Sequence, residues 1–369
     1  MSDDTPLAGR LHVYVAFDWG EEVDLAVAQR QGAGVFLDMV RRPRTPASIA
    51  YRPPPLRFPL GPVAVSMPGL DGPPLTHAEA TVFDFGGVSV AFVFPFSMSR
   101  GELRLLAAKL TEPATAKQIR QTARAVLEPL FHKLMPAITR PDWPETLWEE
   151  YFVFQFAPCE GCAPERLLGE DAGWLAGLLR LEDEPLSGQE TAEALKLTLR
   201  YGTRDLFVPD WAAAALVDHE GESDETLQAV EFANLQLLEY RHIDQRLDAV
   251  LARADDLLRK GAGGRLPLFG HGRPLRELGE LKVEANGLFE RTGNVLKLVG
   301  DQYVSRLYRL LSTRFHLPEW EKSIGRKLEV LEGVYEAVSD QAAHFRSELL
   351  EVLVVLLIVT EIVISLVKH

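Results

Sequence analysis

The chain has 369 residues, of which 47% are hydrophobic and 25% charged, a balance that excludes an intrinsically disordered protein and leaves room for two domains. Its 53 acidic residues outnumber 39 basic ones, which argues against broad nucleic-acid binding because a polyphosphate attracts a net basic face. Two cysteines cannot form a disulfide framework, and the acidic start over residues 1–4 is unlike a signal or transit peptide, which favours a reducing cytoplasm.

The first strong pattern lies between Leu11 and Trp19, where apolar residues alternate with His12, Tyr14, Ala16 and Asp18. Alternation with a period of two predicts a strand with one buried face. A helix over about 21–31 and a strand over 35–40 follow, before a proline-rich connection. The densest strand signal runs from residue 80 to residue 94, and the Gly86-Gly87 pair within it predicts a tight hairpin.

A similar succession recurs in the next part of the chain. Helices are predicted over about 100–110 and 117–135, and a strand over 151–157. Two more helices follow, over about 164–181 and 187–200, and then a second hairpin over 205–217 that turns at Pro209-Asp210. The recurrence of strand, helix and hairpin predicts an α+β head domain over residues 1–218, built from two loosely similar βαββ halves.

Beyond residue 218 the pattern becomes helical, with apolar residues stepping by three and four between about 230 and 258. A glycine-rich break over 261–274 separates this helix from another predicted over 275–315, and Pro318 suits the first turn of the next. These helices predict an antiparallel coiled-coil stalk over residues 219–345. The seam of the last helix is predicted at Ile324, Leu328, Leu331, Tyr335, Val338, Ala342 and Phe345.

The last part of the chain, residues 346–369, is predicted to be a membrane-anchoring helix. Its apolar run over 349–367 would span roughly 28 Å as a helix, close to the ~30 Å hydrocarbon thickness of a bilayer. The positive-inside rule then keeps the head in the cytoplasm, because most basic residues precede the run. The anchoring side chains are predicted to be Leu349, Val352, Leu353, Leu356, Leu357, Val359, Val363 and Leu366.

Polar residues leave other interpretations of the tail open. Arg346, Glu351 and Glu361 would be functional polar groups at the membrane, yet a charge at the depth of Glu361 costs about 2.5 to 3.5 kcal/mol. Glu361 could have a partner or could simply extend its carboxylate toward the headgroups. The alternatives to an anchor are a buried core helix and one arm of a coiled coil in an aqueous compartment.

No catalytic constellation, cofactor site or metal site is predicted. Cys159 and Cys162 form a CxxC without a second ligand pair, so two incidental thiols in a loop are expected rather than a redox or zinc centre. The glycine-rich stretch over 261–272 lacks a phosphate-binding motif, and the acidic runs at 182–184 and 255–256 are typical of solvated surface. His242 and His316 are expected to be ordinary surface or interface residues.

The C-terminal part of the chain contains the run 301–308, Trp320, Arg326, Lys327, Leu328, Tyr335, Asp340, Arg346, Leu350, Glu351, Glu361 and Ile362. With these residues the chain resembles the required-for-meiotic-nuclear-division (YagE-like) family. A looser likeness covers the segments 83–88 and 205–211, and Val352 stands where members commonly have tryptophan.

The resemblance implies an uncharacterised domain followed by a C-terminal membrane anchor, in a family whose mitochondrial members support translation as oligomeric, non-enzymatic factors. Combined with the residue patterns, it predicts a single-pass inner-membrane scaffold that contacts lipid, self-associates through its helices and organises a protein partner associated with ribosomes. The alternative is an enzyme or small-ligand receptor in the head domain, which a deep polar pocket lined by convergent acids or histidines would favour.

Overall fold

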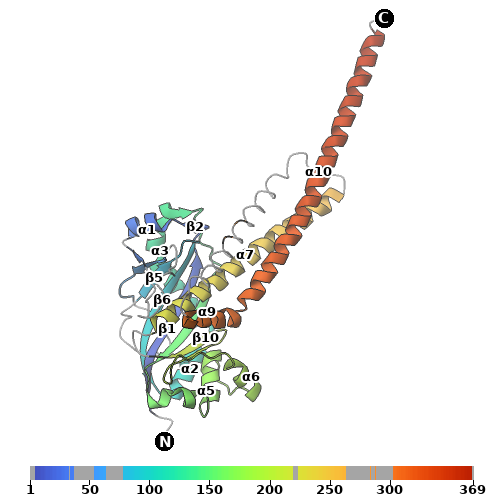
Figure 1. Cartoon of the computed structure of the whole chain (residues 1–369). Coiled ribbons are helices and arrows are strands. Elements are labelled where there is room, and N and C mark those ends of the chain that lie inside the picture. The colour runs from blue at the N-terminus through green and yellow to red at the C-terminus, as the bar shows by residue number, and fades with distance from the viewer. Residues whose placement is uncertain are drawn as a thin grey trace. The chain divides into compact units, whose positions relative to one another are not determined.

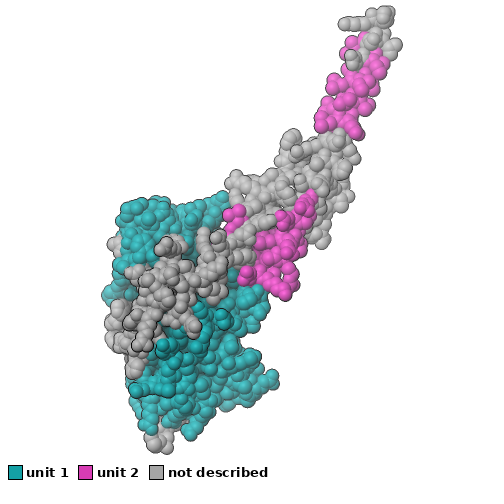
Figure 2. All heavy atoms as spheres, in the orientation of Figure 1, with its two compact units in different colours: residues 1–242, 288–319 teal, residues 243–287, 320–369 magenta. Residues whose placement is uncertain are grey.

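The computed structural model describes residues 5–32, 34–36, 54–63, 78–218, 223–262, 283, 287 and 302–367. The chain divides into two compact units, the first made of residues 1–242 and 288–319 and the second of residues 243–287 and 320–369 (Figure 2). The strands of the described residues all belong to the first unit.

The first unit combines an eight-stranded sheet, a small two-stranded sheet and helices (Figure 1). Its strands are β1 (Leu7–Asp18), β2 (Glu22–Val23), β3 (Val35–Phe36), β4 (Leu56–Pro59), β5 (Ala78–Val82), β6 (Gly87–Met98), β7 (Ile138–Thr139), β8 (Glu149–Phe156), β9 (Leu206–Pro209) and β10 (Ala213–Val217). Its helices are α1 (Leu25–Gly32), α2 (Arg100–Leu110), α3 (Pro113–Leu134), α4 (Pro164–Leu167), α5 (Ala172–Arg180), α6 (Gly188–Ala194), α9 (Gln302–Arg314) and the first part of α7 (Asp224–Ala262).

Strand β1 is the centre of the large sheet, whose order is β3-β4-β5-β6-β1-β8-β10-β9. It pairs antiparallel with β6 over its full length and with β8 on its other side. Strands β8 and β10 are parallel, and the chain between them forms α4, α5, α6 and β9. The sheet is therefore mixed, and its two halves are continuous through β1.

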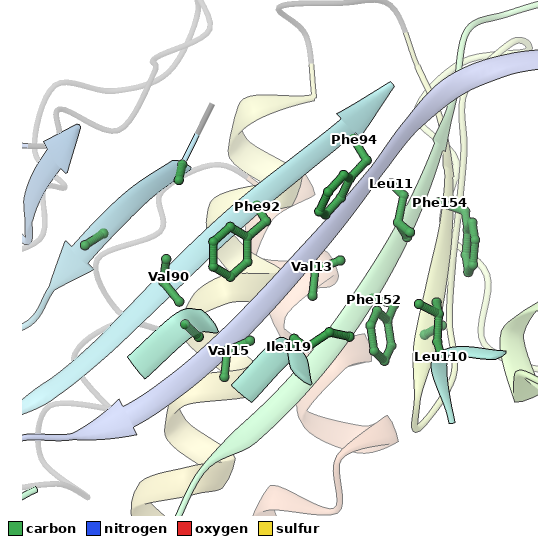
Figure 3. Close-up of a cluster of buried hydrophobic side chains, with 14 of the residues drawn as sticks. Leu11, Val13, Val15, Val90, Phe92, Phe94, Leu110, Ile119, Phe152 and Phe154 are labelled. Atoms are coloured by element: carbon green, nitrogen blue, oxygen red, sulfur yellow. The ribbon is translucent and has the colours of Figure 1, made fainter. Parts of the chain in front are cut away.

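One face of the sheet forms the main hydrophobic core. The odd-numbered residues Leu11, Val13 and Val15 of β1 point to this face, where Leu11 and Val13 lie between aromatic residues of β6 and β8 (Figure 3). Ile119 of α3 and Leu110 of α2 cover them, and all five side chains are buried. The apolar residues at every second strand position therefore pack against the apolar faces of two helices.

Local sequence signals set the turns that bring these elements together. Ser99 and Glu102 form a capping box that starts α2 directly after β6. Gly86, in the hairpin between β5 and β6, has φ of +96°, and a Cβ there would lie 1.7 Å from the carbonyl oxygen of Gly20. Only glycine fits this turn. The hairpins predicted at Gly86-Gly87 and at Pro209-Asp210 are both confirmed.

The second unit is helical in its described residues, with the last part of α7 and most of α10 (Leu317–Val367). Lys327 of α10 reaches two carboxylates of α7, with its Nζ 2.7 Å from Asp244 Oδ1 and 2.6 Å from Asp248 Oδ1. Buried apolar residues accompany this contact, namely Ile243, Leu247, Val250, Ile324, Leu328 and Leu331.

The predicted fold class is wrong as a whole. Over the described residues the structure is an α+β fold with one mixed eight-stranded sheet and helices, and neither the predicted long coiled-coil stalk nor the predicted transmembrane helix is evident there. The predicted seam illustrates the reason: Ile324, Leu328 and Leu331 are buried, but later apolar positions of the same repeat are exposed. The side chains of Tyr335, Val338, Ala342 and Phe345 lie outside the described ones. A three-four repeat specifies one helical face, but not a partner along its full length.

The predicted membrane anchor and the inner-membrane localisation are also wrong. Among the described residues, no helix combines the length and the apolarity that crossing a bilayer requires. Two acids, Glu351 and Glu361, fall within the apolar run that suggested the anchor. The described members of the predicted anchor are 50% to 64% exposed on α10, namely Leu353, Leu356, Leu357, Val359 and Val363, whereas the side chains of Leu349, Val352 and Leu366 are not among those described.

Candidate functional site

The second face of the large sheet buries polar residues. The even-numbered residues His12 and Tyr14 of β1 point to this face and are only 6% and 4% exposed. Thr81 of β5 and Ser89 of β6 are register partners that are also buried, and Gln155 of β8 stands opposite Arg10. The sequence pattern predicted one buried face for β1, but in the structure both faces are buried.

The first turns of α7 cover this polar face and leave a cavity of about 420 Å³ between the helix and the sheet. Helical spacing aligns Asp224, Gln228 and Glu231 on the side of α7 that faces the strands. The cavity is lined by Arg10, His12, Tyr14, Arg57, Glu79, Thr81, Ala91, Val93, Pro95, Asp224, Leu227, Gln228 and Glu231.

A chain of hydrogen bonds holds one wall of the pocket. His12 Nε2 lies 2.7 Å from Gln155 Oε1, and Gln155 Nε2 donates to Ser223 Oγ over 2.9 Å. Because Gln155 accepts from His12 through its amide oxygen, the imidazole carries its proton on Nε2. Burial lowers the pKa of His12 to about 4, an effect that the Gln155 hydrogen bond opposes and Arg10 reinforces. His12 is therefore a neutral wall residue at physiological pH.

A buried carboxylate forms the opposite wall. Glu231 is 3% exposed, and its Oε2 lies 3.8 Å from Arg57 Nη2, while Arg57 Nη1 lies 3.3 Å from Glu79 Oε2. Burial raises the pKa of Glu231, and Arg57 and the neighbouring Ser89 and Thr81 hydroxyl groups oppose that rise. Glu231 Oε1 nevertheless has no hydrogen-bond partner of normal geometry among the described residues. One guanidinium is thus shared by two carboxylates.

Tyr14 lies between these two walls. Its ring stacks on His12 with centroids 6.3 Å apart and planes 11° from parallel. Burial and the Glu231 carboxylate raise the pKa of Tyr14 well above its usual value. The phenol therefore keeps its proton and offers the pocket a neutral hydroxyl group and an aromatic face.

The comparison with known families covers the strands that line this pocket, but not Leu227, Gln228 and Glu231 of α7. The family profile described as "Uncharacterized protein MJ0711, N-terminal domain" matches residues 8–224, more than half of the chain. The chain belongs to the MJ0711 family. A relative from Methanocaldococcus jannaschii, itself named "Uncharacterized protein MJ0711", is 28% identical over 220 residues, which cover 60% of this chain and 66% of the relative. No solved structure matches the chain.

Membership of the MJ0711 family corrects the resemblance drawn from the sequence. Most residues that carried the likeness to the required-for-meiotic-nuclear-division family lie between 301 and 362, outside the matched region. They lie mainly on α9 and α10, where repeated apolar and charged positions occur in many unrelated long helices. The looser segments 83–88 and 205–211 lie in the two hairpins of the MJ0711 domain. The ribosomal partner implied by that resemblance loses its support.

The polar residues predicted at the tail are not among the residues that line the pocket. Glu351 is exposed on α10, while the side chains of Arg346 and Glu361 lie outside the described ones. Cys159 is exposed and Cys162 buried, and both are free thiols. Burial raises the pKa of Cys162, so its thiol stays protonated. Over the described residues, no group of histidine, cysteine and acidic side chains could hold a metal ion.

The histidines singled out in the sequence have different environments. His242 of α7 pairs through Nδ1 with Oδ2 of Asp18 at the end of β1, and Gly20 N donates to Asp18 Oδ1 over 2.9 Å. His316 is exposed and begins the turn before α10 with φ of 54°. The glycine-rich stretch over 261–272 falls largely outside the described residues.

A second buried polar cluster joins helices to the β9–β10 hairpin. Asp210 is fully buried, with its Oδ2 2.6 Å from Arg180 Nε and its Oδ1 3.2 Å from Arg314 Nη1. The Tyr151 hydroxyl donates to the Asp210 carbonyl oxygen over 2.7 Å. Since the Asp210 carboxylate is matched by two guanidinium groups, the cluster is a structural connection between α5, α9 and the hairpin.

Proposed function

We propose that the α+β unit is a receptor for a small polar molecule that binds in the pocket between the sheet and α7. The observation that carries this proposal is the cavity of about 420 Å³ with buried polar walls. Small-molecule sites are usually concave, with volumes of roughly 300–1,000 Å³ and a few placed polar groups. His12, Tyr14 and Glu231 are such groups, each on a regular element that fixes its position.

The composition of the pocket argues against a purely structural role. Burying a polar group without a hydrogen bond costs roughly 1–3 kcal/mol, so a protein interior normally satisfies each one. Glu231 Oε1 has no hydrogen bond of normal geometry among the described residues, although the Ser89 and Thr81 hydroxyl groups lie beside the carboxylate. A bound molecule would supply the missing interaction at Glu231, which lines the cavity.

The experiment that tests the proposal compares two tryptophan variants of the full chain. Val93→Trp places an indole in the cavity, whereas Ser97→Trp adds the same side chain at an exposed position further along β6. A library of polar metabolites is screened by thermal denaturation, since a ligand at a hundred times its Kd stabilises a protein by about 2.7 kcal/mol. Stabilisation of wild type and S97W but not of V93W supports the proposal, and equal stabilisation of all three places the binding elsewhere.

A specific observation also favours a second function, self-association through α10. Between Leu350 and Ile364, the described large apolar side chains of this helix are 50% to 64% exposed. Contiguous exposed apolar surface of this kind marks an interaction site. We propose a second copy of the chain as the partner, because the steps of three and four repeat along this helix and an identical helix would match them.

Matched variants separate association along the seam from general adhesion. Leu356→Asn changes a seam position and Leu357→Asn changes its neighbour on another face, and both side chains are about equally exposed, at 59% and 64%. Sedimentation velocity of the full chain is expected to show an oligomer that L356N weakens more than L357N. A monomeric wild type, or equal weakening by both variants, would remove the proposal.

A further inference from the structure

We infer that the molecule received by the pocket carries a protonated aliphatic amine, and that the Glu231 carboxylate accepts hydrogen bonds from this ammonium group. The inference rests on the proposed receptor function and goes further by naming the ligand class. It follows from the charge balance of the walls, from the position of Glu231 and from the aromatic ring beside it.

The ionisable groups of the described walls leave an excess of negative charge. Three carboxylates line the cavity, on Glu79, Asp224 and Glu231, against the two guanidinium groups of Arg10 and Arg57. His12 adds no positive charge, because it is buried and neutral above a pKa of about 4. An anionic ligand would increase this imbalance, whereas a cation would correct it.

The imbalance is concentrated near Glu231. Arg57 is divided between Glu79 and Glu231, and its nearer contact, at 3.3 Å against 3.8 Å, is with Glu79. Glu231 is the more buried partner, with a side chain 4% exposed against 38% for Glu79. A carboxylate taken out of water requires a close positive charge and full hydrogen bonding. Arg57 supplies the charge only in part, and Oε1 of Glu231 has no hydrogen bond of normal geometry among the described residues.

The surroundings of Glu231 suit an ammonium group in particular. An ammonium group has three N–H donors and no acceptor, so it can bond to a carboxylate oxygen and to a hydroxyl oxygen at once. Thr81 lines the same part of the cavity as Glu231 and lies beside its carboxylate. The Tyr14 ring also lines the cavity, and an aromatic face attracts a cation. The hydroxyl of Thr81 and the ring of Tyr14 thus complement the carboxylate.

The test uses three series of simple probes on the full chain at neutral pH: linear primary amines, the carboxylates of equal carbon number and the corresponding alcohols. Isothermal titration calorimetry measures the affinity of each. We expect the amines to bind at least tenfold more tightly than the alcohols and the carboxylates to bind most weakly. V93W is expected to abolish amine binding, whereas S97W is expected to leave it unchanged.

Two matched glutamine variants connect the binding to one side chain. Glu231→Gln keeps the shape of the side chain and removes its charge, and amine affinity is expected to fall roughly a hundredfold because a buried charge pair loses one member. Glu239→Gln makes the same change about two turns further along α7, at another buried glutamate that does not line the cavity, and should not alter binding. Thermal melting checks that both variants are folded.

A third variant keeps the inference testable if Glu231→Gln does not fold. Glu79→Gln removes a carboxylate from the same end of the cavity at a partly exposed position, and about a fivefold loss of amine affinity is expected. Unchanged affinity in every folded acid variant would overturn the inference. So would tighter binding of carboxylates or alcohols; if V93W blocked that binding, the receptor function would survive and only the ligand class would fail. Absence of binding by all amines at millimolar concentration would also overturn the inference.

Discussion

The two faces of the large sheet show how differently a protein can bury the same strands. On one face Val13 lies among aromatic and aliphatic side chains with no polar neighbour on β1, and α2 and α3 seal it (Figure 3). On the other face the next residue, Tyr14, is almost as buried but lies beside His12, Arg57 and Glu231. The first face is complete without a ligand. The second keeps a cavity and a buried carboxylate that shares the Arg57 guanidinium with Glu79, and we propose that binding occurs there.

Desolvation, however, acts on both faces. Glu150 of β8 stands opposite Val15 on the apolar face, and burial raises its pKa from 4.5 to about 7. His12 on the polar face has a pKa lowered by burial to about 4. Each group is therefore driven toward its neutral form. At these two positions the faces differ in the kind of ionisable group, while burial acts on both groups.

The largest expected effect comes from removing a large buried side chain from the apolar face. Phe154→Ala removes a fully buried ring opposite Leu11 and should lower the free energy of unfolding by about 3–5 kcal/mol. Both the lost burial of the ring and the cavity that it leaves destabilise the folded state. Urea denaturation followed by circular dichroism measures this. Val93→Ala, on the partly exposed wall of the pocket, serves as the control and should cost less than about 1.5 kcal/mol. Equal losses would mean that the two faces are packed alike.

The next largest effect concerns Glu150, the carboxyl group on the apolar face whose pKa is raised by burial. The folded chain keeps the Glu150 proton that the unfolded chain releases between pH 4.5 and about 7, so the free energy of unfolding falls as pH rises through this window. The total loss is up to roughly 3 kcal/mol. Glu150→Gln should remove this slope and stabilise the protein at pH 8. Glu128→Gln, at an exposed site of α3, should leave the slope unchanged, and a slope that persists in E150Q would refute the assignment.

A smaller effect is expected on the polar face, with the opposite sign. The unfolded chain takes up a proton on its imidazole below pH 6.5, whereas folded His12 stays neutral down to about pH 4, so stability is lost as pH falls through this interval. His12→Leu leaves Gln155 Oε1 without its donor and should cost about 1–3 kcal/mol at pH 7.5. At pH 4.5 the cost should shrink.

The control for that variant is His132→Leu, at an imidazole with a 62% exposed side chain, which should change stability by less than about 0.5 kcal/mol at either pH. The windows of Glu150 and His12 overlap between pH 4.5 and 6.5, and their slopes oppose each other. The wild-type profile is therefore flatter than that of either variant. A cost of His12→Leu that does not depend on pH would show that the imidazole is not neutral in the fold.

The local elements of the sheet could be predicted from the sequence, because they depend on neighbouring residues. Alternation located β1, and Gly86-Gly87 and Pro209-Asp210 located the hairpins. The order of the sheet could not be predicted in the same way, since β1 pairs with β8 across more than a hundred residues. The long apolar repeat of α10 misled for a related reason: it specifies a helix, but neither a membrane nor a partner.

The pocket was missed because its residues look like surface positions in each element separately. His12 and Tyr14 fall on the polar side of an alternating strand, where exposure to solvent is the usual expectation. One signal was present in α7, where Asp224, Gln228 and Glu231 recur at steps of four and three along the first turns of the helix. A polar stripe on a helix indicates a site only when the helix is known to pack against a polar strand. The contact between α7 and β1 joins residues that are far apart in the sequence, so local patterns do not predict it.

The smallest expected effect comes from the substitution of valine by threonine, made once on each face. Val93→Thr puts a hydroxyl group on the partly exposed pocket wall, where water can bond to it, and should change the free energy of unfolding by less than about 0.5 kcal/mol. Val13→Thr puts the same group into the fully buried apolar face, where a hydroxyl without a partner costs roughly 1–3 kcal/mol. The two changes are identical in volume and the residues are one register step from each other, since Val93 pairs with His12. Urea denaturation of both variants isolates hydration as the difference between the faces, and equal costs would show that the pocket is closed to water.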